Sequence, residues 1–340
     1  MLNQIYQLVK PRNILVKYEE QSVDCHKVII QPNYMALCHA DQRYYQGKRD
    51  SIVLAKKLPM ALIHEACGTV LFDPTNTFKI GQKVVMIPNQ PPKMSDEYFY
   101  ENYMEGAYFL SSGFNGFMQE FVSLPADRVV PYNDIEDKLA VLTEFVSVAM
   151  HAINRFEHVA HLRREHIAIF GDGSLAYVTA IALRYYYPEV HITVFGRNED
   201  KLKMFNFVNN TLLTHQLLSS EIQFDHAFEC CGGQGSEMAI DDIIKYINPQ
   251  GTLILMGVSD SKISVNTRDI LEKGLTLVGS SRSGRDDFEK AIAMMSSTRV
   301  QNLLRHIIYE FGSVKSINDI HRVFEMDLST LFKTVFKWEV

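Results

Sequence analysis

The stretch IAIFGDGSLA, residues 167–176, decides the fold of the second half of this chain. Its first four residues are apolar and predict a short buried strand, and a helical run follows the turn. At the turn, Gly171, Gly173 and Ala176 fit the pattern G-x-G-x-x-A in the strand–turn–helix context that the pattern requires. The first glycine permits a tight turn, the second lets a pyrophosphate approach the backbone, and the alanine lets the helix pack closely on the sheet.

The start of the predicted helix supplies the other half of a phosphate site. Backbone N–H groups around Ser174 and Leu175 have no partner inside the helix, and the helix dipole favours negative charge there. We therefore predict that a dinucleotide binds at this turn. An ordinary strand-to-helix turn, which also uses glycine, is the alternative.

The next predicted strand indicates which dinucleotide binds. It ends in VFGR, residues 194–197, where an NAD site usually carries an acidic residue for the ribose 2′-hydroxyl. Gly196 removes that carboxylate, Arg197 offers a cation, and Lys201 follows one helical turn later. This arrangement favours NADPH, although Arg197 as a solvated loop charge is the alternative.

Further strands alternate with helices and predict a doubly wound parallel sheet. Residues 191–195, 225–229, 252–257 and 275–279 are short apolar strands, and residues 241–246 are helical. We assign residues 151–299 to this α/β domain.

The first 150 residues have a different pattern. Strands at 27–32, 68–72 and 81–88 are broken by Pro and Gly without regular helices, which predicts an irregular, mostly antiparallel β domain. Residues 89–108 are expected to form an extended loop. The tail, about 300–340, is mixed and is expected to return to the first domain.

Composition excludes several classes of protein. The chain has 340 residues and a formal net charge of −6, which disfavours broad attraction to nucleic acid or anionic lipid. Its five cysteines have no disulfide spacing, which is typical of a reducing compartment. The N-terminus is too polar for a signal peptide, and no apolar run reaches the length of a membrane helix. We expect a soluble cytoplasmic protein without membrane or nucleic-acid partners.

The first domain carries three polar clusters in apolar surroundings. They are Cys38 with Asp41, His64 with Glu65, and Glu144. Unpaired charges there would be costly, and a metal ion would offset that cost. Thiolate, imidazole and carboxylate all bind zinc, and three such ligands with one open position describe a catalytic site. From the residues alone, ordinary buried cysteine and histidine are an equal alternative.

These clusters resemble the motifs of the medium-chain alcohol and polyol dehydrogenases. IHE at 63–65 is similar to their G-H-E, and C-x-x-D at 38–41 is present. GFNGFMQEFV at 113–122 and TEFVSVAMHA at 143–152 resemble two further family stretches. The resemblance covers nearly the whole chain, and it implies a GroES-like catalytic domain followed by a Rossmann domain.

The resemblance also implies residue roles. Cys38, His64 and Glu144 would bind zinc, Glu65 would be an adjacent or exchanging ligand, and Asp41 would orient His64 through its ring. Two departures matter. No cysteines lie near residues 85–110, so a single catalytic zinc is expected without a structural one.

The second departure concerns the proton relay. Ala40 stands where the family carries a Ser or Thr hydroxyl. His39, Tyr44, a chain of water molecules or a hydroxyl of the substrate are the candidate replacements, and the residues do not choose among them.

A closer resemblance concerns the substrate. MALCHADQRYYQG at 35–47 and GSSRSG at 279–284 are similar to ribulose-5-phosphate reductases. This similarity implies NADPH-dependent reduction of D-ribulose 5-phosphate to D-ribitol 5-phosphate, for CDP-ribitol and the teichoic acids of the bacterial cell wall. Arg43 and Arg282 are the candidate cations for the substrate phosphate.

The same resemblance implies partners. The family commonly dimerises by joining sheets at an edge of the nucleotide domain, and the apolar run 252–258 is a candidate edge, although a buried strand has the same composition. A cytidylyltransferase is a candidate partner because it would act on the product.

Three other functions are open at this stage. A polyol or ketose dehydrogenase would accept the unphosphorylated sugar, a zinc-free quinone or enoyl reductase would lack metal, and a nucleotide-binding protein without catalysis would bind NADPH without turnover. Dependence on the substrate phosphate, metal content and turnover distinguish them.

Overall fold

A computed structural model describes residues 1–96, 98–219 and 222–340 as two compact units. The first unit comprises Met1–Ser147 and Ser283–Val340, and the second comprises Val148–Arg282. The return of the chain to the first unit therefore begins at Ser283, earlier than the position near 300 expected from composition. Arg285 explains this, because its guanidinium Nη1 donates to the backbone oxygens of Asp127 and Val129, at 2.8 and 3.0 Å.

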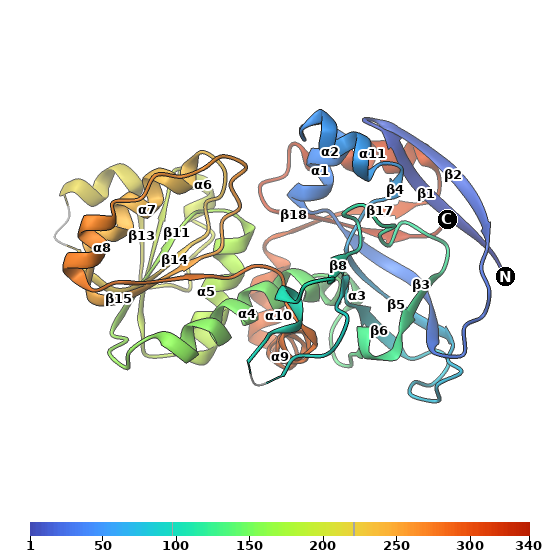
Figure 1. Ribbon diagram of the computed structural model, residues 1–340, viewed down its shortest axis with the longest axis horizontal. Helices are drawn as coiled ribbons and strands as arrows, with labels where there is room; N and C mark the ends of the chain where they lie inside the picture. The colour runs from blue at the N-terminus through green and yellow to red at the C-terminus, as the bar shows by residue number, and fades with distance from the viewer. Residues whose placement is uncertain (97, 220–221) are drawn as a thin grey trace. The chain divides into compact units, whose positions relative to one another are not determined.

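The second unit contains a parallel sheet with the strand order β13-β12-β11-β14-β15-β16 (Figure 1). The order reverses at β11, which is the switch point of a doubly wound fold. Its strands are β11 (His166–Phe170), β12 (His191–Gly196), β13 (Asn210–Leu213), β14 (Phe224–Glu229), β15 (Ile247–Leu255) and β16 (Thr276–Gly279). Its helical elements are α5 (Ser174–Tyr186), α6 (Glu199–Leu202), η3 (Thr214–Ser219), α7 (Gly235–Tyr246) and α8 (Thr267–Lys273).

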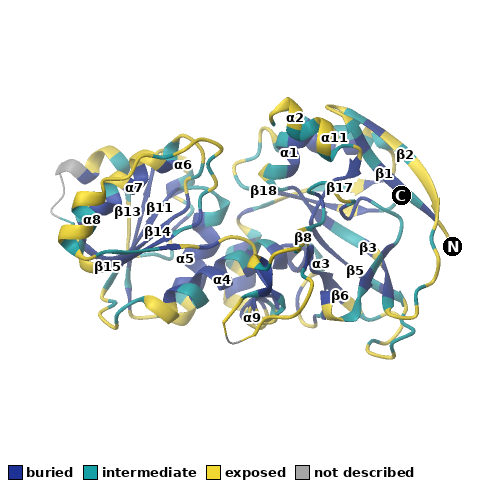
Figure 2. Ribbon diagram, in the orientation of Figure 1, coloured by how far each residue is buried: buried dark blue, intermediate teal, exposed yellow. Residues whose placement is uncertain are grey.

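Helices and buried apolar strands make the core of this unit. Helix α5 packs on β11 and β12, and α7 packs on β14 and β15. Right-handed crossovers on either side of the switch point place such helices on opposite faces of a sheet. All six residues of β14 are buried, as Figure 2 shows by its dark strands. Phe170 and Phe195 stack with ring centroids 4.7 Å apart, joining β11 to β12.

The first unit is built mostly on antiparallel strands, as its Pro- and Gly-broken sequence predicts, although β17 and β18 pair in parallel. One sheet has the order β10-β6-β5-β3-β18-β17, with β9 also paired to β3, and a smaller sheet has the order β2-β1-β4. Its strands are β1 (Leu2–Lys10), β2 (Asn13–Glu20), β3 (Lys27–Ala36), β4 (Met60–Ala61), β5 (Glu65–Phe72), β6 (Lys83–Met86), β7 (Asn89–Gln90), β8 (Tyr108–Phe109), β9 (Val122–Pro125), β10 (Val129–Pro131), β17 (Ile308–Val314) and β18 (Lys333–Trp338).

The helical elements of the first unit include three from its C-terminal part. They are α1 (His39–Tyr45), α2 (Ser51–Lys57), η1 (Glu101–Tyr103), η2 (Ala126–Arg128), α3 (Asp137–Ala140), α9 (Arg285–Met295), α10 (Thr298–Arg305) and α11 (Ile317–Asp327), while α4 (Thr143–Val159) begins in this unit and continues into the second. Strand β18 pairs antiparallel with β3, and Phe324 and Trp338 belong to the same apolar core as Leu8. The expected return of the tail is thus made by a shared sheet and a shared core.

Several boundaries differ from the sequence-based expectations. Strand β3 continues through Pro32 to Ala36, because a register shift between Pro32 and Tyr34 accommodates the missing N–H. The segment 89–108 is more ordered than an extended loop, since β7 pairs with β8 and the Arg128–Glu101 ion pair is buried. Strand β15 pairs with both β14 and β16, so the run 252–258 does not form the edge of the sheet.

No helix in the described residues is both long and apolar enough to cross a membrane.

His226 lies inside the second unit, and its two hydrogen-bonding contacts require a neutral ring. Its Nε2 lies 3.0 Å from the carbonyl oxygen of Arg163, and its Nδ1 accepts from the backbone N–H of Thr252 at 3.1 Å. Burial, and to a lesser extent His161, whose ring centroid is 4.3 Å away, lower the pKa of His226 to about 4. A proton on Nδ1 would oppose the N–H of Thr252, so only the neutral ring fits both contacts.

We predict that this ring makes the protein less stable in mild acid. The unfolded chain binds a proton at His226 near pH 6.5 and the folded chain only near pH 4, so stability is complete above pH 6.5 and falls as pH drops. From neutral pH to about pH 5, His226 should cost roughly 1–2 kcal/mol. Urea unfolding of the wild type and of His226→Gln at both pH values measures this. Parallel losses in the two proteins would rule out His226 as the source.

Candidate functional site

The pairing of β3 with β5 brings the predicted metal ligands of the first unit together. In this antiparallel register Ala36 lies opposite Glu65, so Cys38, two residues beyond Ala36, comes close to His64 and Glu65. Ligand atoms of Cys38, His64 and Glu65 all lie within 4.8 Å of one another. His64 and Glu65 are buried, and Cys38 is half-buried at the start of α1.

Ile63 holds His64 in position through an unusual backbone conformation. Its φ is +69°, a left-handed value that β-branched residues rarely adopt and that the G-H-E motif assigns to glycine. Its N–H donates to Asp41 Oδ1 at 3.0 Å, and its carbonyl accepts from the Phe117 N–H at 2.7 Å. Such strain costs about 1–3 kcal/mol and persists where surrounding contacts impose it.

Asp41 is in the place expected of a residue that orients His64. Its Oδ2 lies 3.3 Å from Nδ1 of His64, while its Oδ1 also accepts from Ser111 Oγ at 2.7 Å. Burial alone would raise the pKa of Asp41, but His64 and the hydrogen bonds hold it below its ordinary value. Burial alone would lower the pKa of His64, but Asp41 and Cys38 raise it well above its usual range.

Lys333 is the residue of this site that the sequence did not indicate. Its Nζ donates to Glu65 Oε1 at 2.6 Å and to the carbonyl of Leu37 at 2.8 Å, and it lies 4.6 Å from the ring centroid of Phe145. Both members of the Lys333–Glu65 pair are almost fully buried. In the sequence, a lysine near the end of the chain looks like an ordinary exposed strand residue. Only the pairing of β18 with β3 shows that Lys333 lies beside Glu65.

Glu144 is buried near the start of α4 but is not part of the group whose ligand atoms lie within 4.8 Å. Burial raises the pKa of Glu144 to about 7, with His64 and Lys333 opposing the rise and Glu65 adding to it. The carboxyl group is therefore close enough to interact electrostatically with His64, Glu65 and Lys333. A bound cation would favour its ionised form.

The donor set fits a zinc ion. Cys38, His64 and Glu65 supply a sulfur, a nitrogen and an oxygen ligand, which zinc accepts together. Oxygen Oε2 of Glu65 is buried without a hydrogen-bond partner in the described part of the chain. Buried polar atoms are normally paired, so an unpaired carboxylate oxygen at this place is explained by a missing cation.

Asp24, Cys25 and His26 form a second group with metal-ligating atoms close together. They are consecutive in the connection between β2 and β3, and Cys25 and His26 are exposed. Asp24 is already engaged, because its Oδ1 accepts from the N–H of His26 at 2.9 Å and its Oδ2 lies 3.8 Å from Lys27 Nζ. This group therefore resembles an ordinary polar turn.

In the second unit, the glycine turn has the geometry that its sequence predicts. Gly171 has φ +131°, and a Cβ there would lie 3.1 Å from backbone atoms of Cys230. A Cβ on Gly173 would meet no protein atom within 4 Å, so the backbone is open there to another molecule. Ala176 is fully buried in α5, while Ser174 and Leu175 begin that helix.

Gly196 is required for a reason that the sequence analysis missed. A Cβ at Gly196 would lie 2.6 Å from Cβ of Asp172 and 2.8 Å from its Oδ2. This Oδ2 accepts from the N–H groups of Arg197 and Asn198, at 2.6 and 2.8 Å. A carboxylate therefore does stand beside Gly196, and it is used to hold the loop that carries the exposed Arg197. Lys201 follows on α6 and is half-buried.

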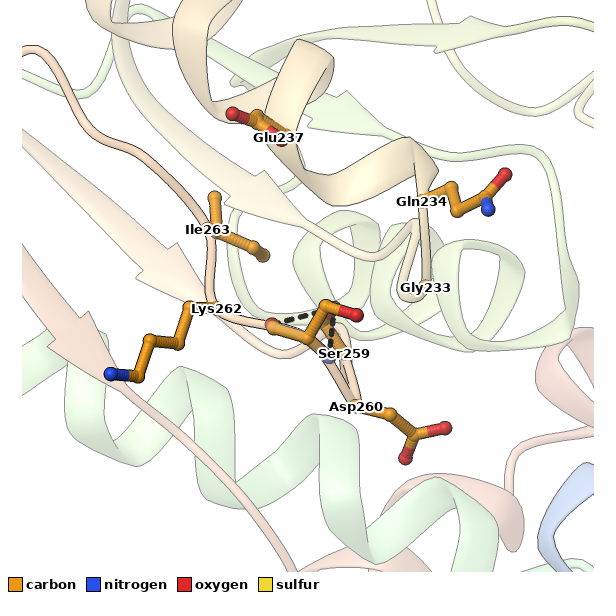
Figure 3. Close-up of a pocket in the computed structure, with 8 residues that line it drawn as sticks. Gly233, Gln234, Glu237, Ser259, Asp260, Lys262 and Ile263 are labelled. Atoms are coloured by element: carbon orange, nitrogen blue, oxygen red, sulfur yellow. Dashed lines mark hydrogen bonds between the residues drawn. The ribbon is translucent and has the colours of Figure 1, made fainter. Parts of the chain in front are cut away.

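A cavity of about 320 Å³ lies beside the N-terminus of α7 (Figure 3). Glu237, Asp260 and Lys262 contribute its charged groups, and Ser259 bonds to Ser261 on its wall. With two carboxylates and one cation, the lining has a net negative charge and would repel a phosphate. We therefore place the predicted dinucleotide at the glycine turn and not here.

The two candidate phosphate cations of the sequence analysis are in different units. Arg43 is on α1 in the first unit, where its Nε and Nη2 lie 3.4 and 3.3 Å from the carbonyl oxygen of Lys48. Arg282 is the last residue of the second unit, is exposed, and has φ +60°. The structure therefore does not bring the two together within one unit.

Comparison with known proteins identifies relatives along the whole chain. The alcohol dehydrogenase GroES-like domain matches residues 24–134, and the glucose dehydrogenase C-terminus matches residues 137–337. A ribulose-5-phosphate reductase of Streptococcus pneumoniae is 61% identical over 100% of this chain and 98% of its own length. Ribulose-5-phosphate reductase 1 of Staphylococcus aureus is 47% identical over 99% of both chains.

A solved structure also resembles the chain over its full length. The crystal structure of S. aureus TarJ in complex with NADPH superimposes with a TM-score of 0.88 at 44% identity, covering all of both chains. Galactitol-1-phosphate dehydrogenase from Escherichia coli, at 18% identity and a TM-score of 0.78, shares the fold.

We predict that Lys333→Met destabilises the chelator-treated protein by about 3–5 kcal/mol, because the carboxylate of Glu65 is then buried without its cation. Adding Glu65→Gln should recover most of the loss, since the charge itself is removed. Urea unfolding measures both effects. Lys337→Met is the matched control, because Lys337 is on the same strand but exposed, and it should change stability by less than about 1 kcal/mol. An equal effect of the two lysines would contradict a special role for Lys333.

Proposed function

We propose, starting from the membership of this chain in the medium-chain dehydrogenase family, that it reduces D-ribulose 5-phosphate to D-ribitol 5-phosphate with NADPH. Its matches to curated ribulose-5-phosphate reductases extend over the full chain and support this substrate. The single structural observation that carries the proposal is the close grouping of Cys38 with the buried His64 and Glu65. D-Ribulose 5-phosphate, NADPH and a proton give D-ribitol 5-phosphate and NADP⁺.

The first unit would hold the zinc ion and the reacting carbonyl group. Cys38, His64 and Glu144 would be its ligands, with Glu65 adjacent or exchanging, as the family pattern implies. When bound, the zinc supplies a Lewis acid that polarises the carbonyl group of the ketose. Asp41 keeps the ring of His64 oriented, and Lys333 balances the charge of Glu65.

The second unit would bind NADPH, which supplies the hydride. The turn at Gly171 and Gly173, with Ser174 and Leu175 at the start of α5, would receive the pyrophosphate. Arg197, with Lys201 one turn later, would face the 2′-phosphate, and Asp172 would keep the loop of Arg197 in place. The NADPH complex of TarJ supports this choice of cofactor.

The proton route is a prediction with several candidates. Ala40 is on α1 and has no hydroxyl. His39 and Tyr44 are the protein groups considered for the relay, beside a chain of water molecules or a substrate hydroxyl. Ser111 is not an obvious substitute, because its hydroxyl already donates to Asp41.

The proposed role is the supply of ribitol 5-phosphate for CDP-ribitol and the teichoic acids of the cell wall. A cytidylyltransferase is the predicted partner, and NADPH use together with cysteines that form no disulfides in the described chain supports a cytoplasmic reaction. A homodimer remains a prediction. If it forms by joining sheets, the edge strands of the described parallel sheet are β13 and β16, since β15 is internal.

The direct test measures NADPH oxidation by the zinc-loaded protein with D-ribulose 5-phosphate, with free D-ribulose and with NADH in place of NADPH. We expect fast turnover only with the phosphorylated ketose and NADPH, with ribitol 5-phosphate identified as the product. Equal rates with free ribulose would favour a general polyol dehydrogenase. NADPH binding without turnover of either sugar would favour a nucleotide-binding protein without catalysis.

A metal measurement tests the zinc site without using activity. We predict about one zinc per chain in the purified protein and loss of most of it in Cys38→Ser, because the thiolate ligand is removed. Elemental analysis after dialysis gives the zinc content. Cys25→Ser is the matched control, since Cys25 belongs to the exposed group, and it should keep the metal. A zinc-free wild type would instead support a zinc-free reductase.

A further inference from the structure

Two cations from different segments of the first unit lie against the ring of Tyr44. Tyr44 is buried on α1. The guanidinium carbon of Arg49 is 5.0 Å from the ring centroid, and Nζ of Lys57, the last residue of α2, is 5.8 Å from it. The face of an aromatic ring attracts cations at such distances. The ring therefore brings two positive charges to one place.

Two adjacent serines connect this place to the candidate metal site. Nζ of Lys57 donates to Ser112 Oγ at 2.7 Å, and Ser111 Oγ donates to Asp41 Oδ1 at 2.7 Å. Neighbouring Cα atoms are about 3.8 Å apart, so the ammonium group is on the order of 10 Å from the Asp41 carboxylate that contacts His64. A pentulose phosphate with a contact at each end spans a distance of this order.

The ammonium group of Lys57 itself is not paired with a carboxylate in the described part of the chain. Lys57 is half-buried. A partly desolvated ammonium group without a carboxylate partner is favourable when a ligand supplies the negative charge. Its neighbour on α2, Lys56, is exposed and provides an internal comparison.

We propose that Lys57 and Arg49, held against Tyr44, bind the phosphate group of the substrate, an inference that rests on the proposed function. Arginine can hold a phosphate through two parallel hydrogen bonds, and lysine adds a compact point charge. The carbonyl end of the ketose then lies toward His64, and the phosphate lies beyond Ser112. Arg43, which precedes Tyr44 on α1 and contacts the carbonyl oxygen of Lys48, adds a positive charge on the same helix.

The test compares Lys57→Met and Arg49→Met with the wild type. Each loses a charge-assisted contact, so the ratio of kcat/KM for D-ribulose 5-phosphate to that for free D-ribulose should fall about 10- to 100-fold. Calorimetric affinity for ribitol 5-phosphate, which needs no turnover, should weaken by a similar factor. Lys56→Met should leave both quantities unchanged, and Lys57→Arg should recover part of the loss.

The outcomes separate this inference from the proposed function. A wild type that does not prefer the phosphorylated ketose contradicts the proposed function. A wild type with that preference, together with Lys57→Met and Arg49→Met variants that keep the ratio and the ribitol 5-phosphate affinity within twofold, overturns the phosphate site alone. Thermal unfolding checks that the variants are folded. If Lys57→Met does not fold, Arg49→Met and Lys57→Arg decide by the same two measurements.

Discussion

The candidate site of the first unit depends on the contacts made by the carboxylate of Asp41. This carboxylate is fully buried, and it links α1 to the backbone at Ile63, to the ring of His64 and to the hydroxyl of Ser111. A buried carboxylate is costly unless every contact is made, so these segments hold their positions together. The left-handed backbone of Ile63 is kept in this way. The same contacts fix the distance between His64 and the loop at Ser111, whose next residue, Ser112, accepts a hydrogen bond from Lys57.

A second carboxylate has the same organising role in the second unit. Asp172, inside the glycine turn, binds the backbone of the loop after β12, and Gly196 is needed because that side chain leaves no room for a Cβ. The turn expected to receive the pyrophosphate and the loop that carries Arg197 are thereby joined. The residues expected at the pyrophosphate and at the 2′-phosphate are thus positioned by one side chain. In each unit an acidic residue positions groups that we propose to act in binding or catalysis.

Charge balance in the buried site depends on residues distant in the sequence. Glu65 follows His64, but its cation, Lys333, comes from the last strand of the chain. The C-terminal return therefore completes the site as well as the sheet. Glu144 approaches from α4, and burial raises its pKa, with a smaller contribution from Glu65. A divalent cation is the natural counter-charge for such a group.

The sequence by itself determined the fold class, the glycine turn and the clusters at Cys38, His64 and Glu144, because local spacing and short motifs carry that information. It also predicted the return of the tail. Only the tertiary structure decided the partner of Glu65, the reason for Gly196 and the grouping of Arg49 and Lys57 around Tyr44. Those depend on strand pairing and on contacts between segments far apart in the chain. A charged residue has the same local sequence pattern whether it faces solvent or pairs with a buried carboxylate. Its burial and its partner therefore follow only from the tertiary structure.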